Sequence, residues 1–406
     1  MQVNVIGLGY IGLPTALIVS AHGADVIGTD LNQQTVEKLQ SGVLTFQEDG
    51  LAELFSKARN NGILFSKVCK SAQMYIVCVP TPYNKVSKRI NPDFVISAVR
   101  DVLRVCGKGA VIVIESTMPP GTIDRYVRPL IAETNADVHL AHAPERIIPG
   151  NMIWELENNS RTIGADSPIV AEEVRKVYAT FCRGEIVLTD IRTAEMSKVV
   201  ENTFRDINIA FANELLKICR EDGLDVHEVI RIANKHPRVS ILSPGPGVGG
   251  HCISVDPWFL VGDYPEQSQL IRKARETNDG MPGYVLQRIS DIAQERGIAS
   301  SRIGFYGLTY KEDVSDIRES PTIQLIEMMR ERLSPAPKCF DPLCGKRLYE
   351  SQYAEFDDFL REIDMLVIMV SHNHLRENWE RVKKKLIFDT RNSGLKATAG
   401  NEIIPL

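Results

Sequence analysis

Three glycines with the spacing of a phosphate-binding turn stand near the start of the 406-residue chain. Gly7, Gly9 and Gly12 follow the apolar run at residues 2–6, and Asp30 ends the next apolar run. Glycines at this spacing allow a tight turn and let a pyrophosphate approach the amino-terminus of a helix. An acidic side chain at the end of the second strand accepts hydrogen bonds from the adenosine ribose and repels a 2′-phosphate. The pattern predicts a site for NAD rather than NADP.

A second candidate site surrounds Cys252, which follows a segment dense in glycine and proline at residues 244–250. Such a segment fixes an irregular loop, and irregular loops often carry function. A nearby cation such as Lys198 would lower the pKa of the thiol and make it a nucleophile. The alternative interpretation is a buried cysteine that only packs. Asp256, four residues later, could position water, serve as a base, or be a turn carboxylate before Pro257.

Residues 185–222 contain neither glycine nor proline, and the pattern over 192–221 predicts one long helix. Apolar residues recur on several faces of it, which is typical of a buried helix that joins two domains and a subunit partner. Lys198, Asn202 and Arg205 have the spacing of one helix face. This face either belongs to the site or is a polar stripe exposed to solvent.

Short apolar runs alternate with amphipathic stretches on both sides of this helix, which predicts parallel βαβ units. We expect strands at 2–6, 25–29, 74–79, 110–115, 138–141, 302–306, 338–340, 365–370 and 386–388, and helices at 93–105, 322–332 and 377–385. The predicted fold is of the α/β class, with two Rossmann-like doubly wound domains joined by the long central helix. The predicted domains are an NAD-binding domain at 1–184, a helical dimerisation and catalytic-loop domain at 185–300, and an α/β domain at 301–406.

Composition narrows the class of protein. The 47 Lys and Arg residues against 52 Asp and Glu give a net charge of −5, without a block of like charge, which argues against a nucleic-acid partner. No apolar run reaches the ~18 residues of a membrane span, so we expect a cytoplasmic protein without membrane contact. The eight cysteines form no CxxC pair, and neither Cys339 with Cys344 nor His372 with His374 has a partner pair at zinc spacing. A reduced, metal-free protein is expected.

The motifs are similar, nearly from end to end, to those of the nucleotide-sugar 6-dehydrogenase family. The matching segments are GLGYIGLP (7–14), VPTP (79–82), EST (115–117), APER (143–146), AEMSKVVENTFRDINIAFANEL (194–215), GPGVGGHCISVDP (245–257), GLTYK (307–311) and DIRESP (316–321). Members of this family oxidise the C6 alcohol of a UDP-sugar to a carboxylate with two NAD. The resemblance implies a carboxy-terminal UDP-binding domain and a homodimer built on the long helix.

The resemblance also assigns catalytic roles. Cys252 is similar to the nucleophile that captures the C6 aldehyde. Lys198 and Asn202 resemble the pair that stabilises the oxyanion, and Asp256 resembles the acid that orders the catalytic water. Glu145 and Thr117 resemble residues that deprotonate or position water during thioester hydrolysis.

Binding roles follow from the same resemblance. The implied cofactor contacts are Gly7, Gly9, Tyr10, Ile11, Gly12, Asp30, Thr81, Thr117 and Arg318. The implied substrate contacts are Glu145, Arg146, Ile147, Lys198, Asn202, Arg205, His236, Arg238, Gly249, Tyr310, Lys311 and Lys396, several of them from the partner subunit.

One segment bears on the substrate. UDP-glucose dehydrogenases commonly have Phe-Leu after the glutamate that corresponds to Glu145, whereas this chain has Arg146, which can donate to an amide carbonyl or a diphosphate. Residues 234–239 resemble the UDP-N-acetylmannosamine dehydrogenases, which supply an aminouronic acid for bacterial surface polysaccharides. The configuration at C2 does not follow from these residues. UDP-N-acetylglucosamine or UDP-glucose 6-dehydrogenase is an alternative, as is a non-catalytic nucleotide-sugar-binding protein. The Cys252 loop and the second α/β domain argue against a two-electron hydroxyacid dehydrogenase.

Overall fold

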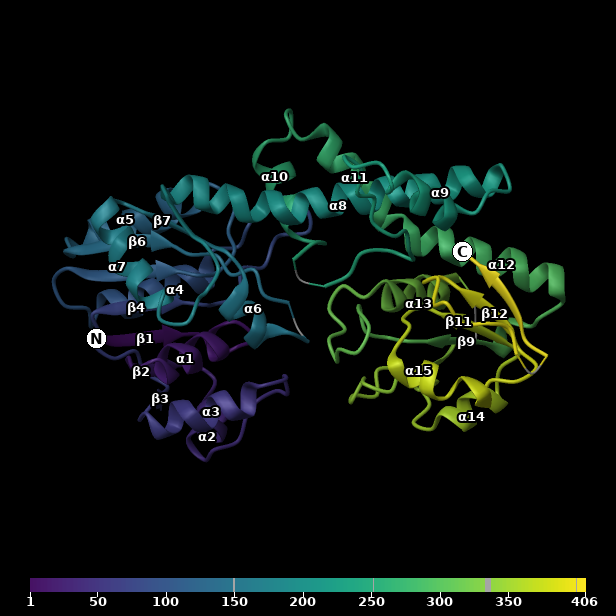
Figure 1. The fold of residues 1–406 in the computed structure, drawn as a ribbon, viewed down its shortest axis with the longest axis horizontal. Coiled ribbons are helices and arrows are strands. Elements are labelled where there is room, and N and C mark those ends of the chain that lie inside the picture. The colour runs from purple at the N-terminus through teal and green to yellow at the C-terminus, as the bar shows by residue number, and fades with distance from the viewer. Residues whose placement is uncertain (149, 251, 333–336, 399) are drawn as a thin grey trace. The chain divides into compact units, whose positions relative to one another are not determined.

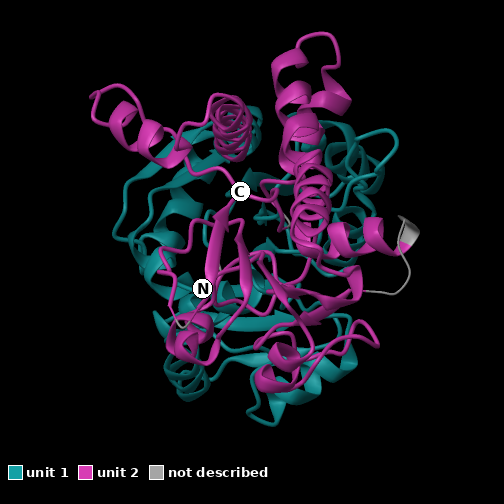
Figure 2. Ribbon diagram, turned by 90° about the vertical axis from the view of Figure 1, so that its right-hand side faces the viewer, with its two compact units in different colours: residues 1–201 teal, residues 202–406 magenta. Residues whose placement is uncertain are grey.

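The computed structural model describes residues 1–148, 150–250, 252–332, 337–398 and 400–406. Two compact units make up the chain, residues 1–201 and residues 202–406 (Figure 2). Each unit contains one sheet, and the helix α8 (Ile191–Glu221) crosses the boundary between them. The α/β class with two parallel sheets and a long helical linker is confirmed.

The first unit contains an eight-stranded sheet in the order β3-β2-β1-β4-β5-β6-β7-β8 (Figure 1). Neighbouring strands are parallel, except that β6 and β7 are antiparallel. The strands are β1 (Gln2–Ile6), β2 (Asp25–Thr29), β3 (Leu64–Ser66), β4 (Met74–Val77), β5 (Ala110–Ile114), β6 (Val138–His142), β7 (Arg161–Ala165) and β8 (Ile186–Thr189). The helices are α1 (Gly12–Ala21), α2 (Gln33–Gln40), α3 (Leu51–Asn60), α4 (Asp93–Leu103), a π-helical turn (Ile123–Val127), α5 (Arg128–Thr134), α6 (Met152–Asn158) and α7 (Pro168–Tyr178).

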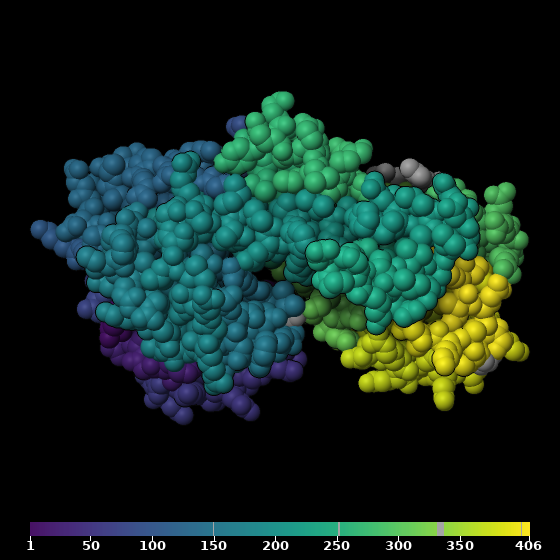
Figure 3. Space-filling view, turned by 45° about the horizontal axis from the view of Figure 1, so that its top comes forward, coloured from purple at the N-terminus to yellow at the C-terminus, as the bar shows by residue number. Residues whose placement is uncertain are grey.

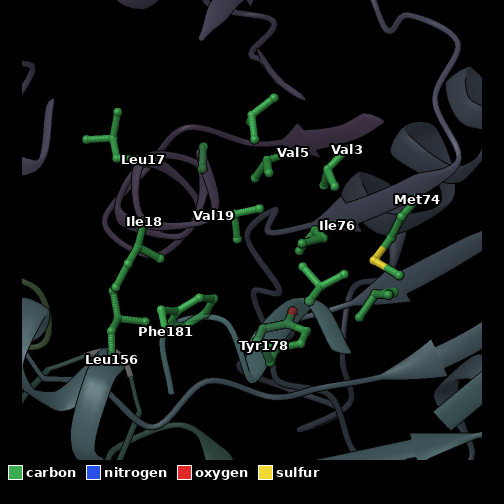
Figure 4. Close-up of a cluster of buried hydrophobic side chains, with 14 of the residues drawn as sticks. Val3, Val5, Leu17, Ile18, Val19, Met74, Ile76, Leu156, Tyr178 and Phe181 are labelled. Atoms are coloured by element: carbon green, nitrogen blue, oxygen red, sulfur yellow. The ribbon is translucent and has the colours of Figure 1, made fainter. Parts of the chain in front are cut away.

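The core of this unit lies between β1, β4 and the buried helix α1. All ten residues of α1 are buried, because it packs against the sheet and against α3 and α6. Figure 4 shows how side chains of β1 and β4 meet those of α1 together with Tyr178 and Phe181. Because strand order reverses between β1 and β4, the loops after these two strands diverge and leave room for a ligand there.

The second unit contains a five-stranded parallel sheet in the order β10-β9-β11-β12-β13. The strands are β9 (Ile303–Tyr306), β10 (Lys338–Phe340), β11 (Met365–Ile368), β12 (Leu386–Asp389) and β13 (Glu402–Pro405). The helices are α9 (Val226–Ala233), α10 (Asp256–Asp263), α11 (Gln269–Asp279), α12 (Met281–Arg296), α13 (Pro321–Arg332), α14 (Phe356–Arg361) and α15 (Asn373–Glu377), with 3₁₀ turns at Ser300–Arg302 and Trp379–Arg381. Figure 3 shows the teal-green surface around α9 beside the yellow carboxy-terminal residues, where Val226 and Ile230 belong to a cluster that Leu406 joins.

The two sheets repeat one turn. Gly7 follows β1 and Gly307 follows β9, both with positive φ, +90° and +91°. The N–H of each donates to the carbonyl of the last residue of the neighbouring strand, Gly7 to Thr29 of β2 (2.8 Å) and Gly307 to Phe340 of β10 (2.9 Å). At the end of β2, Asp30 then accepts from the backbone of Leu8, and at the end of β10 Asp341 accepts from Leu308. The second sheet therefore presents a nucleotide-type turn without the glycine triplet.

The long helix differs little from the prediction, since it starts at Ile191 instead of residue 192 and contains 31 residues. One line of apolar side chains along it is open to solvent in the single chain. Its members are Val200, Phe204, Phe211 and Ile218, of which Phe204 is 66% exposed. Spacings of four and seven residues place them on one face.

Part of the expected secondary structure was wrong. The helix expected at 377–385 is a short helix α15 followed by a 3₁₀ turn, because Lys384 has a left-handed backbone (φ +54°) that no helix admits. Buried Trp379 donates its indole N–H to the carbonyl of Lys396 (3.0 Å), which fixes the turn instead. The strands β3, β7, β8 and β13 were not expected; β8 lies inside the glycine-free stretch that also holds α8.

A buried carboxyl ties α8 to the first sheet's loops. Glu195 accepts from the backbone N–H of Gly121 (2.5 Å) and of Ile123 (3.0 Å). Burial raises the pKa of this carboxyl from 4.5 to about 7, against the lowering by the two N–H groups. The folded state therefore holds a proton that the unfolded state releases between pH 4.5 and 7.

We predict that this proton makes stability fall with rising pH. The contribution is fully present below pH 4.5 and is lost as pH rises through 7, by about 3 kcal/mol if the whole shift is realised. Melting temperatures of the wild type and Glu195→Gln, measured from pH 5 to 7.5, should converge or cross, with the wild type losing more. Parallel curves for the two proteins would show that Glu195 is ionised throughout.

Candidate functional site

The glycine turn after β1 has the shape that a dinucleotide needs. A Cβ on Gly7 would lie 2.6 Å from the carbonyl oxygen of Cys78, and one on Gly12 would overlap the carbonyl of Gly7. These two glycines are required by packing of the chain itself. A Cβ on Gly9 would meet nothing within 4 Å, so this glycine faces open space where a pyrophosphate can approach.

Asp30 lies at the end of β2 beside this turn. Its Oδ2 accepts from the backbone N–H of Leu8 and its Oδ1 from that of Asn32, both at 2.8 Å. Each carboxylate oxygen has two lone pairs, so capacity remains for ribose hydroxyls. The glycine turn and this acid fit NAD.

Further predicted cofactor residues lie at the same edge of the sheet. The Thr81 hydroxyl donates to the carbonyl of Thr117 (2.8 Å), so the structure brings the loops after β4 and β5 together. Tyr10 is partly exposed and its ring lies 4.5 Å from that of Phe46, while Ile11 packs against the core. Arg318, the remaining predicted cofactor contact, belongs to the second unit.

The loop after β6 is organised by Glu145. Its Oε1 accepts from the backbone N–H of Arg146 (2.6 Å) and of Ile147 (3.2 Å), and its Oε2 pairs with Arg161. The side chain of Ile147 belongs to the hydrophobic core, so this residue offers only backbone atoms to a ligand. Pro149 of the same segment lies outside the described residues.

Arg146 makes protein contacts with both terminal nitrogens. One donates to the carbonyl and hydroxyl of Ser160 (3.0 and 2.9 Å), the other to the hydroxyl of Thr162 (3.0 Å). The second nitrogen also pairs with Glu201 at 2.6 Å. A substrate carbonyl would have to displace one of these acceptors, so the predicted role of Arg146 in substrate choice requires rearrangement.

The nucleophile loop is attached to α8. Asn202 donates its amide N–H to Oδ2 of Asp256 at 2.6 Å, and both side chains are buried. Asp256 begins α10, and its backbone N–H donates to the carbonyl of Cys252 (2.8 Å). Cys252 itself is exposed, and Lys198 is buried on α8 one turn before Asn202. His251 lies outside the described residues.

Two further asparagines on α8 hold the start of this loop, and sequence reasoning missed both. Asn208 donates to the carbonyl of Ser240 (2.8 Å) and accepts from the N–H of Leu242 (2.8 Å). Asn213 accepts from the N–H of Gly245 at 2.9 Å and donates to Asn278 of α11 (2.8 Å). Their carboxamide side chains within the long helix were the available signal.

The same loop packs on predicted substrate contacts of the second sheet. Cβ atoms built on Gly249 and Gly250 would lie 2.7 and 2.9 Å from Tyr310, so only glycine lets the loop approach that ring so closely. The N–H of Gly250 donates to the carbonyl of Arg318 (2.9 Å). The pKa of Arg318 is raised chiefly by its ion pair with Asp316 (2.6 Å), and the charge of Cys252 contributes to the rise. Gly249, Tyr310, Arg318 and Cys252 therefore gather at one place.

The other predicted substrate contacts lie at the surface of the second unit. Arg205, His236, Arg238 and Lys396 are exposed, and Lys311 is half-buried. The backbone N–H of Arg238 donates to Nδ1 of His236 (3.3 Å), which joins these two.

The paired histidines after β11 have protein partners. His372 is buried and contacts Asp341 (3.3 Å) and the N–H of Asp313 (2.9 Å), whereas His374 contacts the hydroxyl of Tyr306 (3.1 Å). Across the described ranges, no three His, Cys, Asp or Glu side chains are placed to hold a metal ion. Asp341 in turn accepts from the turn that precedes Tyr310 and Lys311.

Two matched substitutions test the cofactor turn. Gly9→Ala should leave the melting temperature unchanged and raise the Kd for NAD about tenfold or more, because its methyl group enters only the space of the pyrophosphate. Gly12→Ala should destabilise the fold by about 1–3 kcal/mol, because its methyl group meets backbone. Calorimetry with and without NAD measures both. Equal Kd values for Gly9→Ala and the wild type would contradict the placement of the pyrophosphate.

Comparison with known proteins agrees with this arrangement. Models of the UDP-glucose/GDP-mannose dehydrogenase family match in three parts: the NAD binding domain at residues 1–182, the central domain at 192–280 and the UDP binding domain at 304–394. The described residues include no helix long and apolar enough to cross a membrane.

Individual relatives cover nearly the whole chain. The UDP-N-acetyl-D-mannosamine dehydrogenase of Methanococcus maripaludis is 41% identical over 403 residues, 96% of this chain and 92% of that protein. The NDP-N-acetyl-D-galactosaminuronic acid dehydrogenase of Ralstonia nicotianae is 38% identical, over 96% of this chain and 95% of that protein. The solved structure of a UDP-N-acetyl-mannosamine dehydrogenase from Staphylococcus aureus is 38% identical, with a TM-score of 0.90 over 100% of this chain and 98% of that one. The chain belongs to the UDP-glucose/GDP-mannose dehydrogenase family of NAD-dependent nucleotide-sugar dehydrogenases.

Proposed function

We propose that this enzyme oxidises the C6 alcohol of UDP-N-acetyl-D-mannosamine to the carboxylate, in two steps that consume two NAD. The observation that carries the proposal is the fixed, exposed cysteine loop: Cys252 lies beside Arg318, and its carbonyl is held by the N–H of Asp256. An enzyme that stopped at the aldehyde would not need a thiol. Relatives named for UDP-N-acetyl-D-mannosamine, about 40% identical over their full length, support the choice of sugar.

Each proposed step uses a residue whose surroundings suit it. NAD, held by the glycine turn and Asp30, would supply the hydride acceptor for each oxidation, and the C6 oxygen releases one proton to the surroundings in each. After the first, the thiolate of Cys252 adds to the aldehyde carbon to give a thiohemiacetal, whose C6 hydrogen leaves as the second hydride. Water then adds to the resulting thioester, the C–S bond breaks, and Cys252 leaves as a thiolate.

The oxyanion that forms at C6 requires donors. We assign these to the Lys198 ammonium and the Asn202 amide, which lie one helical turn apart on α8. The second amide hydrogen of Asn202 is available because one hydrogen bond, to Asp256, orients the group. We propose that Asp256 and Glu145 act on the water that hydrolyses the thioester, and that Thr117 positions this water.

Several wider features remain proposals. We propose a homodimer because the apolar line on α8, which includes Phe204 and Phe211, is exposed in the single chain. The family models, which end near 182 and resume near 192 and 304, support the division at 184 and 300. A cytoplasmic location and a role in surface polysaccharide synthesis are likewise predictions.

Comparison of substrates tests the function first. NADH formation should be fastest with UDP-N-acetylmannosamine, and slower with UDP-N-acetylglucosamine and UDP-glucose. Preference for either of the latter would overturn the choice of sugar but retain the chemistry. Tight binding of every UDP-sugar without NADH formation would indicate a non-catalytic binding protein.

Cys252→Ala should separate the two oxidations. The first hydride transfer needs no sulfur, so substrate should still bind and traces of aldehyde should form. Uronate release should fall by several orders of magnitude, about 10³-fold or more, because the covalent route is lost. Uronate assays and the melting temperature are measured together. A cysteine that only packs would instead lower stability and leave uronate formation per folded molecule nearly intact.

Charge on the apolar line of α8 should break the dimer. Phe204→Asp would place an unpaired carboxylate in an apolar interface, which is strongly unfavourable. Light scattering at micromolar concentration should show a monomer for this variant and a dimer for the wild type. Ile169→Asp is the control, since Ile169 is exposed on α7 rather than on α8 and should leave the dimer intact. A wild type that is monomeric and fully active would refute the proposal.

A further inference from the structure

A buried ionic cluster in the first unit contains a cation between two carboxylates. Arg161, on the fully buried strand β7, pairs with Glu145 through one terminal nitrogen and lies 3.4 Å from Glu115 through the other. The three side chains are 5% exposed or less. The guanidinium also stacks over the ring of Tyr178, 4.6 Å from its centre. An arginine so enclosed has little freedom to move away from either acid.

Glu115 connects this cation to the cofactor turn. Its Oε2 accepts from the hydroxyl of Thr15 and the thiol of Cys78, both at 3.0 Å, and its Oε1 accepts from the hydroxyl of Tyr178 (2.9 Å). Thr15 lies on α1, the helix that the glycine turn opens, and Cys78 lies directly below that turn. Figure 4 shows Tyr178 among the side chains that line α1, β1 and β4.

The opposite end of the cluster is the loop of Glu145. Because Oε1 of Glu145 accepts from the N–H groups of Arg146 and Ile147, the orientation of this carboxylate also sets the backbone of the loop. Oε2 contacts Arg161. The cofactor helix and the loop of Glu145 are thus joined through two buried side chains, Glu115 and Arg161.

The charges of the cluster favour a fixed arrangement. Burial opposes the charge of Arg161, but the carboxylates of Glu145 and Glu115 raise its pKa above its ordinary value, so it remains a cation. Burial raises the pKa of Glu115, and Arg161 opposes the rise. One buried cation thus faces two acids, Glu145 and Glu115.

We propose that Arg161 and Glu115 are positioning residues, which hold the Glu145 carboxylate in a fixed place relative to the cofactor turn. The inference rests on the proposed function, in which Glu145 handles the water that hydrolyses the Cys252 thioester. Arg161 supplies the contact that orients the carboxylate, and Glu115 anchors Arg161 to α1. Neither residue touches the reacting atoms. Their loss should slow hydrolysis more than the first hydride transfer.

Arg161→Lys tests the inference, because a lysine keeps the charge but has one head group and cannot contact both acids in the same way. Single-turnover NADH formation, mass spectrometry of the Cys252 adduct and uronate release are measured together. We expect release to slow about tenfold to a hundredfold and the thioester adduct to accumulate, with the first NADH step little changed. Release and adduct occupancy equal to the wild type would overturn the inference, as would an equal decrease of every step.

A matched control exists in the same unit. Arg128 also bridges two acids, Asp124 and Asp166, at 2.7 Å each. Its side chain is 43% exposed, however, and these ion pairs do not involve Glu145. Arg128→Lys should leave adduct occupancy and release unchanged. Adduct accumulation in this variant would show that the effect is unspecific and would overturn the inference.

A second variant covers the possibility that Arg161→Lys does not fold. Tyr178→Phe keeps the ring under Arg161 and removes only the hydroxyl that donates to Glu115. This variant should also slow uronate release and raise the occupancy of the Cys252 adduct, by a smaller factor than Arg161→Lys. Release and occupancy equal to those of the wild type would contradict the inference. Failure of the proposed function is distinguishable, because the wild type would then release no uronate, or Glu145→Gln would hydrolyse the adduct normally.

Discussion

The hydrogen bond between Asn202 and Asp256 is the constraint on which the arrangement of the second unit depends. The segment from residue 240 to 256 has little regular structure, so its backbone must find partners elsewhere. The long helix provides them through Asn208 and Asn213, and Asn202 holds the Asp256 side chain where the segment ends. Because α8 is rigid, it holds the start of the cysteine loop and the helix that follows it at fixed separation. Glycine at 249 and 250 then lets the loop lie against Tyr310.

The first unit solves a related problem with charge. The carboxylate of Glu145 is held by a buried arginine as well as by two backbone N–H groups, and a second acid, Glu115, balances that arginine from the side of the glycine turn. Buried ion pairs contribute little net stability compared with apolar packing, but they tolerate few alternative geometries. In the second unit, carboxamides supply partners to a loop whose backbone has little regular structure. In the first unit, an ionic cluster orients a single carboxylate. The first unit therefore orients a carboxylate by charge, and the second unit holds a loop by carboxamides.

The sequence predicted the positions whose chemistry depends on local pattern. The glycine turn, Asp30 and the extent of α8 could be read because spacing along the chain decides them. Asn208, Asn213 and Arg161 could not, because their importance lies in partners 16 to 65 residues away. The repeat of the turn at Gly307 could not be recognised in the sequence, because Thr309 stands where the first turn has Gly9. The backbone angle φ of Gly307 nevertheless matches that of Gly7. The extra strand β8 was missed because it is a run of only four residues, Ile186–Thr189, without the alternation of a half-buried strand.

The stoichiometry of NADH to uronate tests the central claim, a four-electron oxidation through Cys252, most directly. With UDP-N-acetylmannosamine in excess, NADH is followed by absorbance and both aldehyde and uronate are quantified by chromatography at several times. The account predicts two NADH for each uronate at every time, with no free aldehyde. One NADH for each turnover, with aldehyde accumulating as the product, would contradict it.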